Sequence, residues 1–206
     1  MRFVFAHGAW HGGWCFDAVG RELAALGHEV SAPDLPCDDV SKSQYDYASV
    51  LGPQPEAIVV GHSLGGLTIS LVEARTHVYL AAILPIENVY SDSFPAGFGG
   101  FERDEQGRSY WPDLETTRTR LYPDCTEEQA AHAFPRLRPQ APLAPHIGVF
   151  GPNDVSIACL RDEVVDPAWQ VRAGREHVGR VIELDAGHSP FLTQPAELAA
   201  LLASIV

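Results

Sequence analysis

Two hydrophobic patterns alternate along this chain: short apolar runs typical of buried strands, and the helical spacing typical of amphipathic helices. Short continuous apolar runs predict strands near residues 3–6, 28–32, 57–60, 78–84, 147–150 and 181–184. Apolar residues at helical spacing predict helices near residues 16–26, 64–75, 126–137, 156–170 and 195–204. Strands that alternate with helices predict right-handed crossovers and a parallel sheet covered on both faces. We therefore expect an α/β fold of about six parallel strands.

Residues 85–145 interrupt this alternation. The segment is rich in proline, holds three glycines between positions 97 and 100, and carries the aromatic residues Phe94, Phe98, Phe101, Tyr110, Trp111 and Tyr122. An insertion at this place can form a lid over a site at the sheet edge. We expect a single domain over residues 1–206, with a core of 1–84 and 146–206. A small cap of about 85–145 then lines a substrate pocket.

One pentapeptide carries the strongest chemical prediction. Gly61-His62-Ser63-Leu64-Gly65 follows the apolar run 57–60 and precedes apolar residues at helical spacing. A G-x-S-x-G sequence between a strand and a helix is a nucleophile elbow, a strained turn that exposes the serine hydroxyl. Ser63 is therefore the predicted nucleophile. The alternative is a glycine-rich turn in which the serine only caps a helix.

A serine nucleophile requires a base, and the base requires a third group that orients it. His188 lies in a Gly/Pro loop directly after the predicted strand 181–184, and Asp154 lies just after the predicted strand 147–150. The chain order Ser63, Asp154, His188 is the order expected when a triad is built on such a sheet. Other acidic residues fit less well, because Asp162 and Asp166 fall inside the predicted helix 156–170 and Asp185 is placed to shape the histidine loop.

The first predicted strand leads into a glycine-rich loop, His7-Gly8-Ala9-Trp10-His11-Gly12-Gly13-Trp14. Acyl transfer needs backbone N–H groups aimed at the developing oxyanion, and we assign these donors to Ala9 and Leu64. Trp10 and Trp111 are candidate pocket residues. His7 and His11 are four residues apart, but in a glycine loop without a third ligand they are expected to make structural hydrogen bonds, so no metal site is predicted. His62 is expected to pack against neighbouring loops.

These motifs, together with Gly187-His188-Ser189-Pro190-Phe191, resemble the α/β-hydrolase superfamily over nearly the whole chain. More narrowly, they are similar to the branch of small carboxylesterases, plant methyl esterases and hydroxynitrile lyases. The resemblance implies a carboxylesterase that cleaves small-molecule esters through Ser63, His188 and Asp154, without a cofactor. In relatives of this branch an aliphatic residue follows the acid by two or three positions, as Ile157 follows Asp154.

Other functions on this scaffold stay open. The lyases of the branch place a threonine after the first-motif histidine and a lysine after the catalytic one. This chain has Gly8 and Ser189 there, and Lys42 is its only lysine. An esterase is therefore favoured over a hydroxynitrile lyase. A C–C or thioester hydrolase on the same triad, or a slow or non-catalytic receptor-like protein that binds a ligand, are further alternatives.

Composition narrows the possible partners. A formal net charge of −13 argues against nucleic acid or an anionic membrane as a partner. No stretch approaches the ~18 apolar residues that a transmembrane helix requires, and the predicted fold begins at Phe3, which leaves no room for a signal peptide. Cys15, Cys37, Cys125 and Cys159 lack metal-type spacing and suit reduced thiols. We therefore expect a cytoplasmic enzyme.

Overall fold

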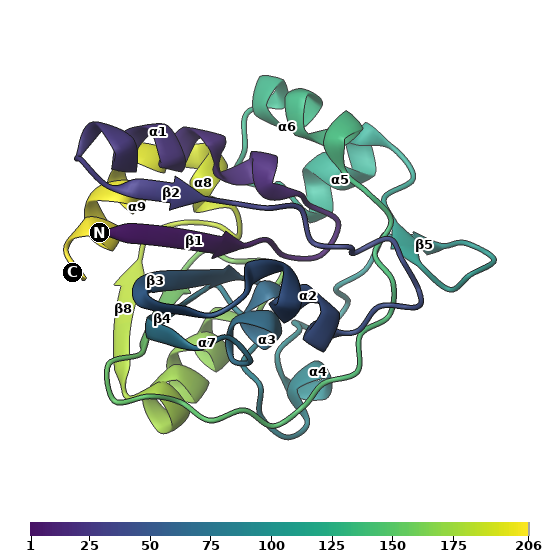
Figure 1. Ribbon diagram of the computed structural model, residues 1–206. Helices are drawn as coiled ribbons and strands as arrows, with labels where there is room; N and C mark the ends of the chain where they lie inside the picture. Colours follow the sequence, from purple (N-terminus) through teal and green to yellow (C-terminus); the bar gives the residue numbers. More distant parts are fainter. Residues whose placement is uncertain (206) are drawn as a thin grey trace.

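A six-stranded parallel sheet forms the centre of the computed structural model, which describes residues 1–205 (Figure 1). The strand order is β2-β1-β3-β4-β7-β8. The strands are β1 (Arg2–Ala6), β2 (Glu29–Ser31), β3 (Gln54–His62), β4 (Ala74–Leu80), β7 (Val155–Cys159) and β8 (Arg180–Leu184). The expectation of an α/β fold with six parallel strands is confirmed.

Neighbouring residues of the central strands belong to opposite faces of the sheet. Along β3, Ile58 and Val60 pack into one hydrophobic cluster, whereas Val59 packs into the other. The two helices α1 (Asp17–Ala25) and α9 (Pro195–Ala203) contribute Leu23 and Leu198 to the first cluster. This division follows from the two-residue period of a strand, and burial on both faces explains why the strands are continuous apolar runs.

The remaining core helices are short. They are α2 (Gln44–Leu51), α3 (Gly65–Ile69), α7 (Pro167–Ala173) and α8 (Pro190–Thr193). A capping box between Ser43 and Asp46 fixes the start of α2. The helix expected over 64–75 ends at Ile69, because the chain must re-enter the sheet at Ala74.

Two expectations for the second half of the chain are wrong. Residues 147–150 form no strand, and Ile147 and Val149 are 69% and 85% exposed. The helix expected over 156–170 is instead strand β7 followed by a turn, and α7 begins only at Pro167. The sequence Val-Ser-Ile-Ala-Cys is buried over its whole length, so it replaces 147–150 as the fifth strand of the sheet.

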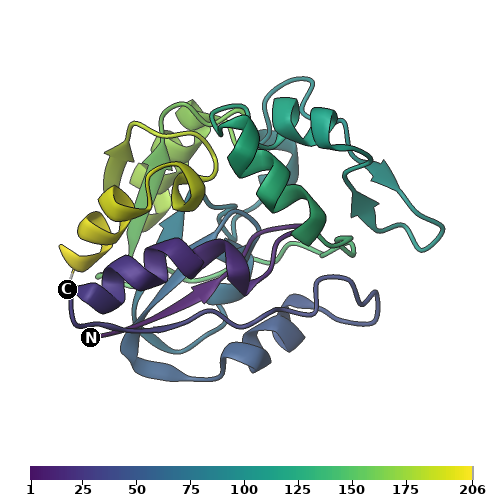
Figure 2. The same ribbon diagram turned by 90° about the horizontal axis from the view of Figure 1, so that it is seen from above.

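Residues 85–145 lie between β4 and β7 and leave the sheet entirely. Their elements are α4 (Val89–Asp92), the hairpin β5 (Glu102–Arg103) with β6 (Ser109–Tyr110), α5 (Leu114–Arg120) and α6 (Glu127–Ala133). The hairpin projects from the body of the molecule in both views (Figures 1 and 2). No helix within residues 1–205 is long and apolar enough to cross a bilayer.

The carboxyl end of β1 and the start of α3 approach each other too closely for a side chain. A Cβ atom on Gly65 would lie 2.3 Å from the carbonyl oxygen of Ala6. A contact that short requires backbone movement, which costs about 1–3 kcal/mol in a packed core. Gly65 is therefore required by packing as well as by the turn.

We expect Gly65→Ala to lower the free energy of unfolding in urea by about 1–3 kcal/mol. Gly99→Ala is the matched control, because a Cβ atom there meets nothing within 4 Å. A stability change for Gly65→Ala no larger than that for Gly99→Ala would show that the backbone at this junction relaxes freely.

Candidate active site

Ser63 occupies a strained turn between β3 and α3. Its φ angle is +51°, a left-handed value that is costly for a residue other than glycine. The strain is held by backbone hydrogen bonds, since Ser63 N–H donates to Leu80 O at 3.1 Å and Ile83 N–H donates to Ser63 O at 2.9 Å. A Cβ atom on Gly61 would lie 2.7 Å from the carbonyl oxygen of Gly65. The predicted elbow geometry is therefore present at Ser63.

His188 lies in the loop that follows β8 and is paired with Asp162. The distance from His188 Nδ1 to Asp162 Oδ2 is 2.8 Å, and both side chains are almost fully buried. Asp162 Oδ1 accepts hydrogen bonds from the backbone N–H groups of Val164 and Val165, and Oδ2 accepts a second one from Gln170 Nε2. Four donors thus satisfy the oxygens of this buried carboxylate. It fixes the proton of His188 on Nδ1 and leaves Nε2 to act as an acceptor.

Asp154 was expected to be this partner, and the expectation is wrong. Asp154 directly precedes β7, whereas Ser63 follows the carboxyl end of β3. Because the strands are parallel, Asp154 lies at the amino ends of the strands and Ser63 at their carboxyl ends. Asp154 instead accepts hydrogen bonds from the His77 backbone N–H at 2.9 Å, from His77 Nδ1 at 3.1 Å and from the Gly151 backbone N–H at 2.8 Å.

Both ring nitrogens of His77 face acceptors, the Asp154 carboxylate and the Val72 carbonyl oxygen, as an imidazolium requires, so the pair is ionic. Burial alone would lower the pKa of His77, but the hydrogen bonds to Asp154 and to the Val72 carbonyl, with the charge of Asp154, raise it. Burial would raise the pKa of Asp154, and the hydrogen bonds from His77 and Gly151 lower it instead. This pair ties the start of β7 to β4 far from Ser63.

The two predicted oxyanion donors flank Ser63. Ala9 and Leu64 both line the cavity into which Ser63 opens. A Cβ atom on Gly8 would lie 2.8 Å from Ser63 Cβ, so the loop after β1 approaches the nucleophile more closely than any side chain allows. This contact explains the glycine at position 8.

The cavity beside Ser63 has a volume of about 400 Å³ and mostly apolar walls. The cap segment supplies most of them, and the full lining is Ala9, Trp10, Ser63, Leu64, Ile83, Tyr90, Phe94, Phe98, Phe101, Arg103, Ser109, Gln140, Ala141, Pro142, Leu143 and Val164. Such a volume accommodates a small organic molecule.

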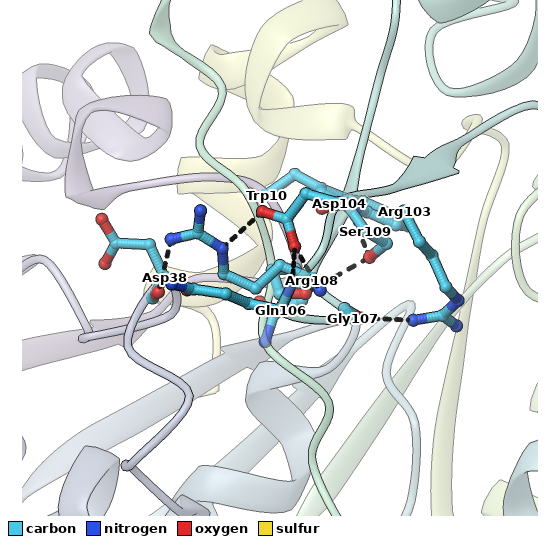
Figure 3. Close-up of polar contacts among 9 residues, drawn as sticks. Trp10, Asp38, Arg103, Asp104, Gln106, Gly107, Arg108 and Ser109 are labelled. Carbon is cyan, nitrogen blue, oxygen red and sulfur yellow. Dashed lines mark hydrogen bonds and ion pairs between the residues drawn. The ribbon is translucent and has the colours of Figure 1, made fainter.

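Of the two tryptophans expected in the pocket, only Trp10 lines it. Trp111 packs behind Trp10, with a ring-centroid separation of 5.2 Å, and is 6% exposed. Trp10 Nε1 donates to Ser109 O at 3.2 Å and to Ser109 Oγ at 3.0 Å. Figure 3 shows the hairpin, where Arg108 donates to the Asp104 carboxylate within the hairpin and to the Asp38 carbonyl oxygen outside it. The hairpin therefore holds the Trp10 wall of the cavity in place.

Three buried histidines connect the loops around Ser63. His7 Nε2 accepts from the Leu35 backbone N–H at 2.9 Å, and His11 Nδ1 donates to Ala9 O at 2.7 Å. His62 Nε2 donates to the His188 backbone carbonyl at 2.9 Å. Burial lowers the pKa of His7 to about 4 and that of His11 to about 3, and it lowers the pKa of His62 well below its usual range. All three are neutral connectors.

Within residues 1–205 no group of three or more His, Cys, Asp or Glu side chains has the arrangement of a metal site. The four cysteines are free thiols.

Asp162 is the site residue that the sequence interpretation missed. Val164 and Val165 follow it by two and three positions, which is the same spacing that supported Asp154. Once residues 155–159 are recognised as the strand, Asp162 lies just past its carboxyl end, where a triad acid belongs.

Comparison with known proteins finds a matching family and similar proteins over nearly the whole chain. The profile described as "Alpha/beta hydrolase family" matches residues 3–201. Methylesterase 10 of Arabidopsis thaliana is 28% identical over 254 aligned positions, which cover 98% of this chain and 90% of that protein. Pyrethroid hydrolase of Sphingobium wenxiniae is 28% identical over 245 positions, with 97% and 85% covered. A solved pyrethroid hydrolase from Sphingobium faniae superposes with a TM-score of 0.76 at 25% identity, covering 99% of this chain and 96% of that one.

The buried histidines predict a loss of stability in acid. For His7, His11 and His62 the folded-state pKa lies below the unfolded value of 6.5, so the unfolded chain binds protons first as the pH falls. Stability is therefore fully present above pH 6.5 and declines toward pH 4, by up to about 1.4 kcal/mol per pH unit for each histidine.

Urea unfolding at pH 7 and pH 5 measures this decline. The contribution of His77 has the opposite sign, because a raised pKa gives stability that is fully present below pH 6.5 and is lost as the pH rises. The lowered Asp154 pKa contributes above its usual 3.8 and is lost below it. An unfolding free energy that stays constant from pH 7 to pH 5 contradicts the neutral state of the three histidines.

Proposed function

Because the chain belongs to the α/β hydrolase family, we propose that it is a serine esterase that cleaves small-molecule carboxylic esters. The observation that carries the proposal is the buried 2.8 Å hydrogen bond between His188 and Asp162, in a loop that is hydrogen-bonded through the His188 carbonyl to His62, the residue before the strained Ser63. The names of the relatives support the ester class, since they include a methylesterase and a pyrethroid hydrolase.

In the proposed mechanism the Ser63 hydroxyl attacks the ester carbonyl while His188 Nε2 takes its proton. Asp162 holds the imidazole in the required tautomer and stabilises its charged form. The backbone N–H groups of Ala9 and Leu64 stabilise the oxyanion. His188 then protonates the departing alkoxide, and a water molecule activated by the same histidine hydrolyses the acyl-enzyme. These steps use only groups of the chain and water, and we propose no cofactor.

The cavity supports a substrate with apolar acyl and alcohol parts. Its walls include the rings of Trp10, Phe94, Phe98 and Phe101, which bind apolar groups by excluding water. We propose that residues 85–145 act as the cap that sets this specificity. The four free thiols and the acidic surface support a cytoplasmic location without nucleic-acid or membrane partners.

A hydroxynitrile lyase is disfavoured by the surroundings of Ser63. The threonine of that branch would have to fit at Gly8, where even a Cβ atom lies 2.8 Å from Ser63 Cβ. The lysine of that branch has no counterpart, because Ser189 follows His188 and Lys42 pairs with Asp46 on α2. The elements required to stabilise a cyanide leaving group are therefore missing from this site.

A fluorophosphonate tests the proposed nucleophile. We expect a single covalent adduct by intact-mass analysis, and hydrolysis of short and long acyl esters by the same protein. Ser63→Ala should lose both the adduct and the hydrolysis, because no other hydroxyl occupies the elbow. An adduct without sustained turnover would favour a ligand-binding protein, and no adduct at all would mean that Ser63 is not activated.

Variants of the two aspartates test whether Asp162 or Asp154 is the acid of the triad. Asp162→Asn should lower kcat by about 10³- to 10⁴-fold, because an amide favours the wrong tautomer of His188. Asp154→Asn should leave kcat within about threefold and lower stability by about 1–3 kcal/mol, since it leaves the His77 cation without its partner. Ester hydrolysis and urea unfolding of both variants measure these effects. The reverse ranking of the two kcat values would restore Asp154 as the acid.

A further inference from the structure

The turn between α5 and α6, residues 121–126, contacts two loops of the active site from the cap side. Tyr122 Oη lies 2.8 Å from Nε2 of His11, in the loop after β1. Two residues later, Asp124 Oδ2 accepts a hydrogen bond at 2.9 Å from the backbone N–H of Gly187, next to His188. The turn therefore touches both the loop of the proposed oxyanion donor and the loop of the proposed base.

The contact with Tyr122 fixes the hydrogen-bonding state of His11. His11 Nδ1 faces the carbonyl oxygen of Ala9, which can only accept, so Nδ1 carries the proton. The neutral ring then offers Nε2 as an acceptor, and the Tyr122 hydroxyl donates to it. Both residues are at most 1% exposed, so water cannot replace this donor.

The peptide that His11 holds is next to a strained residue. Trp10 has a φ angle of +65°, a left-handed value for a bulky side chain, and such a conformation persists only when its surroundings impose it. The Ala9 carbonyl is held by His11, and the Trp10 carbonyl accepts from the Arg138 backbone N–H at 2.7 Å. The Ala9 N–H belongs to the preceding peptide unit, so a freed Ala9 carbonyl loosens the turn on the carboxyl side of this donor and acts on its position through the Ala9 Cα.

The contact between Asp124 and the loop of the proposed base is also tight. A Cβ atom on Gly187 would lie 2.3 Å from the Asp124 carboxyl carbon, so the backbone of the base loop rests directly on this side chain. The next residue, His188, has its own carbonyl held by His62. Hydrogen bonds thus hold the Ala186–Gly187 peptide before the base and the His188–Ser189 peptide after it.

We propose that Tyr122 and Asp124 are positioning residues of the active site, which couple the docking of the cap to the geometry of the oxyanion donor and of the base. The proposal rests on the proposed esterase function, because it assigns Ala9 and His188 their roles. Neither residue touches the substrate cavity. Their effect is on the rate of the chemical step and only weakly on substrate binding.

Tyr122→Phe tests the first contact. We expect kcat to fall about 10- to 100-fold, the range typical of a misplaced or lost oxyanion donor, with KM within about twofold. The rate of fluorophosphonate labelling should fall in parallel. Tyr79→Phe is the matched control, because the buried Tyr79 hydroxyl has no hydrogen-bond partner within residues 1–205 and does not line the cavity.

A structural role alone would give a different result. If Tyr122→Phe lowers the urea midpoint but keeps kcat and the labelling rate of Tyr79→Phe, the positioning role is wrong. Nitrogen NMR of His11 adds an independent readout, since the wild type should show a proton on Nδ1 and a hydrogen-bonded Nε2, and Tyr122→Phe should shift the Nε2 resonance to that of a free acceptor. An unchanged Nε2 resonance in the variant also contradicts the proposal.

Asp124 is tested by a pair of variants. Asp124→Ala should lower kcat about tenfold by freeing the base loop, whereas Asp124→Asn should recover most of it, because its amide oxygen can still accept from Gly187. Equal losses in both variants would contradict the contact. The wild-type protein separates this proposal from the function itself, since a wild type without labelling or hydrolysis overturns the esterase, not the coupling.

Discussion

The structure of the candidate site depends on one buried carboxylate. Asp162 accepts hydrogen bonds from His188, from Gln170 on α7 and from the backbone of its own turn after β7, so it joins the β7–α7 region to the loop of His188, 26 residues later. A charge buried this deeply is tolerated only when it is fully hydrogen-bonded. Gln170 completes the arrangement, because its Oε1 accepts from the Cys159 N–H at the end of β7. Folding of the β7–α7 region and assembly of the acid–base pair are therefore the same event.

The loops around Ser63 are joined mainly by neutral histidines. A neutral imidazole has one donor and one acceptor on opposite sides of a rigid ring, so it can connect two backbone segments where an amide or hydroxyl would leave freedom of rotation. His7 connects the first loop to the segment after β2, and His62 connects the elbow to the loop of His188. Such single-residue connections suit a short chain, whose helix after the elbow has only five residues. It also makes the site sensitive to acid, because each ring must lose its acceptor when it is protonated.

Sequence reasoning located most of the fold and most of the site for a physical reason. The elbow and the histidine loop combine small residues with local strand signals, so Ser63, His188, Ala9 and Leu64 could be proposed as site residues without knowledge of distant contacts. The acid could not, because its position depends on which apolar run pairs with β4. Ile147-Gly148-Val149-Phe150 and Val155-Ser156-Ile157-Ala158-Cys159 both have strand character. The second run forms the strand because it pairs on both sides: Ser156 and Ile157 pair with both β4 and β8.

Because residues 147–150 form no strand, the bounds of the cap could be predicted from the sequence, but its internal structure could not. Residues 141–154 connect the cap to β7 without regular structure, and a side chain such as Val149 is exposed although it is apolar. The aligned region of the methylesterase relative spans 254 positions against 206 residues here, so that protein has internal segments that this chain lacks. With less chain to build the scaffold, a single turn of the cap contacts the loops of both the oxyanion donor and the base. In the proposed esterase, the cap therefore acts both on which substrate enters and on the geometry of the loops that carry Ala9 and His188.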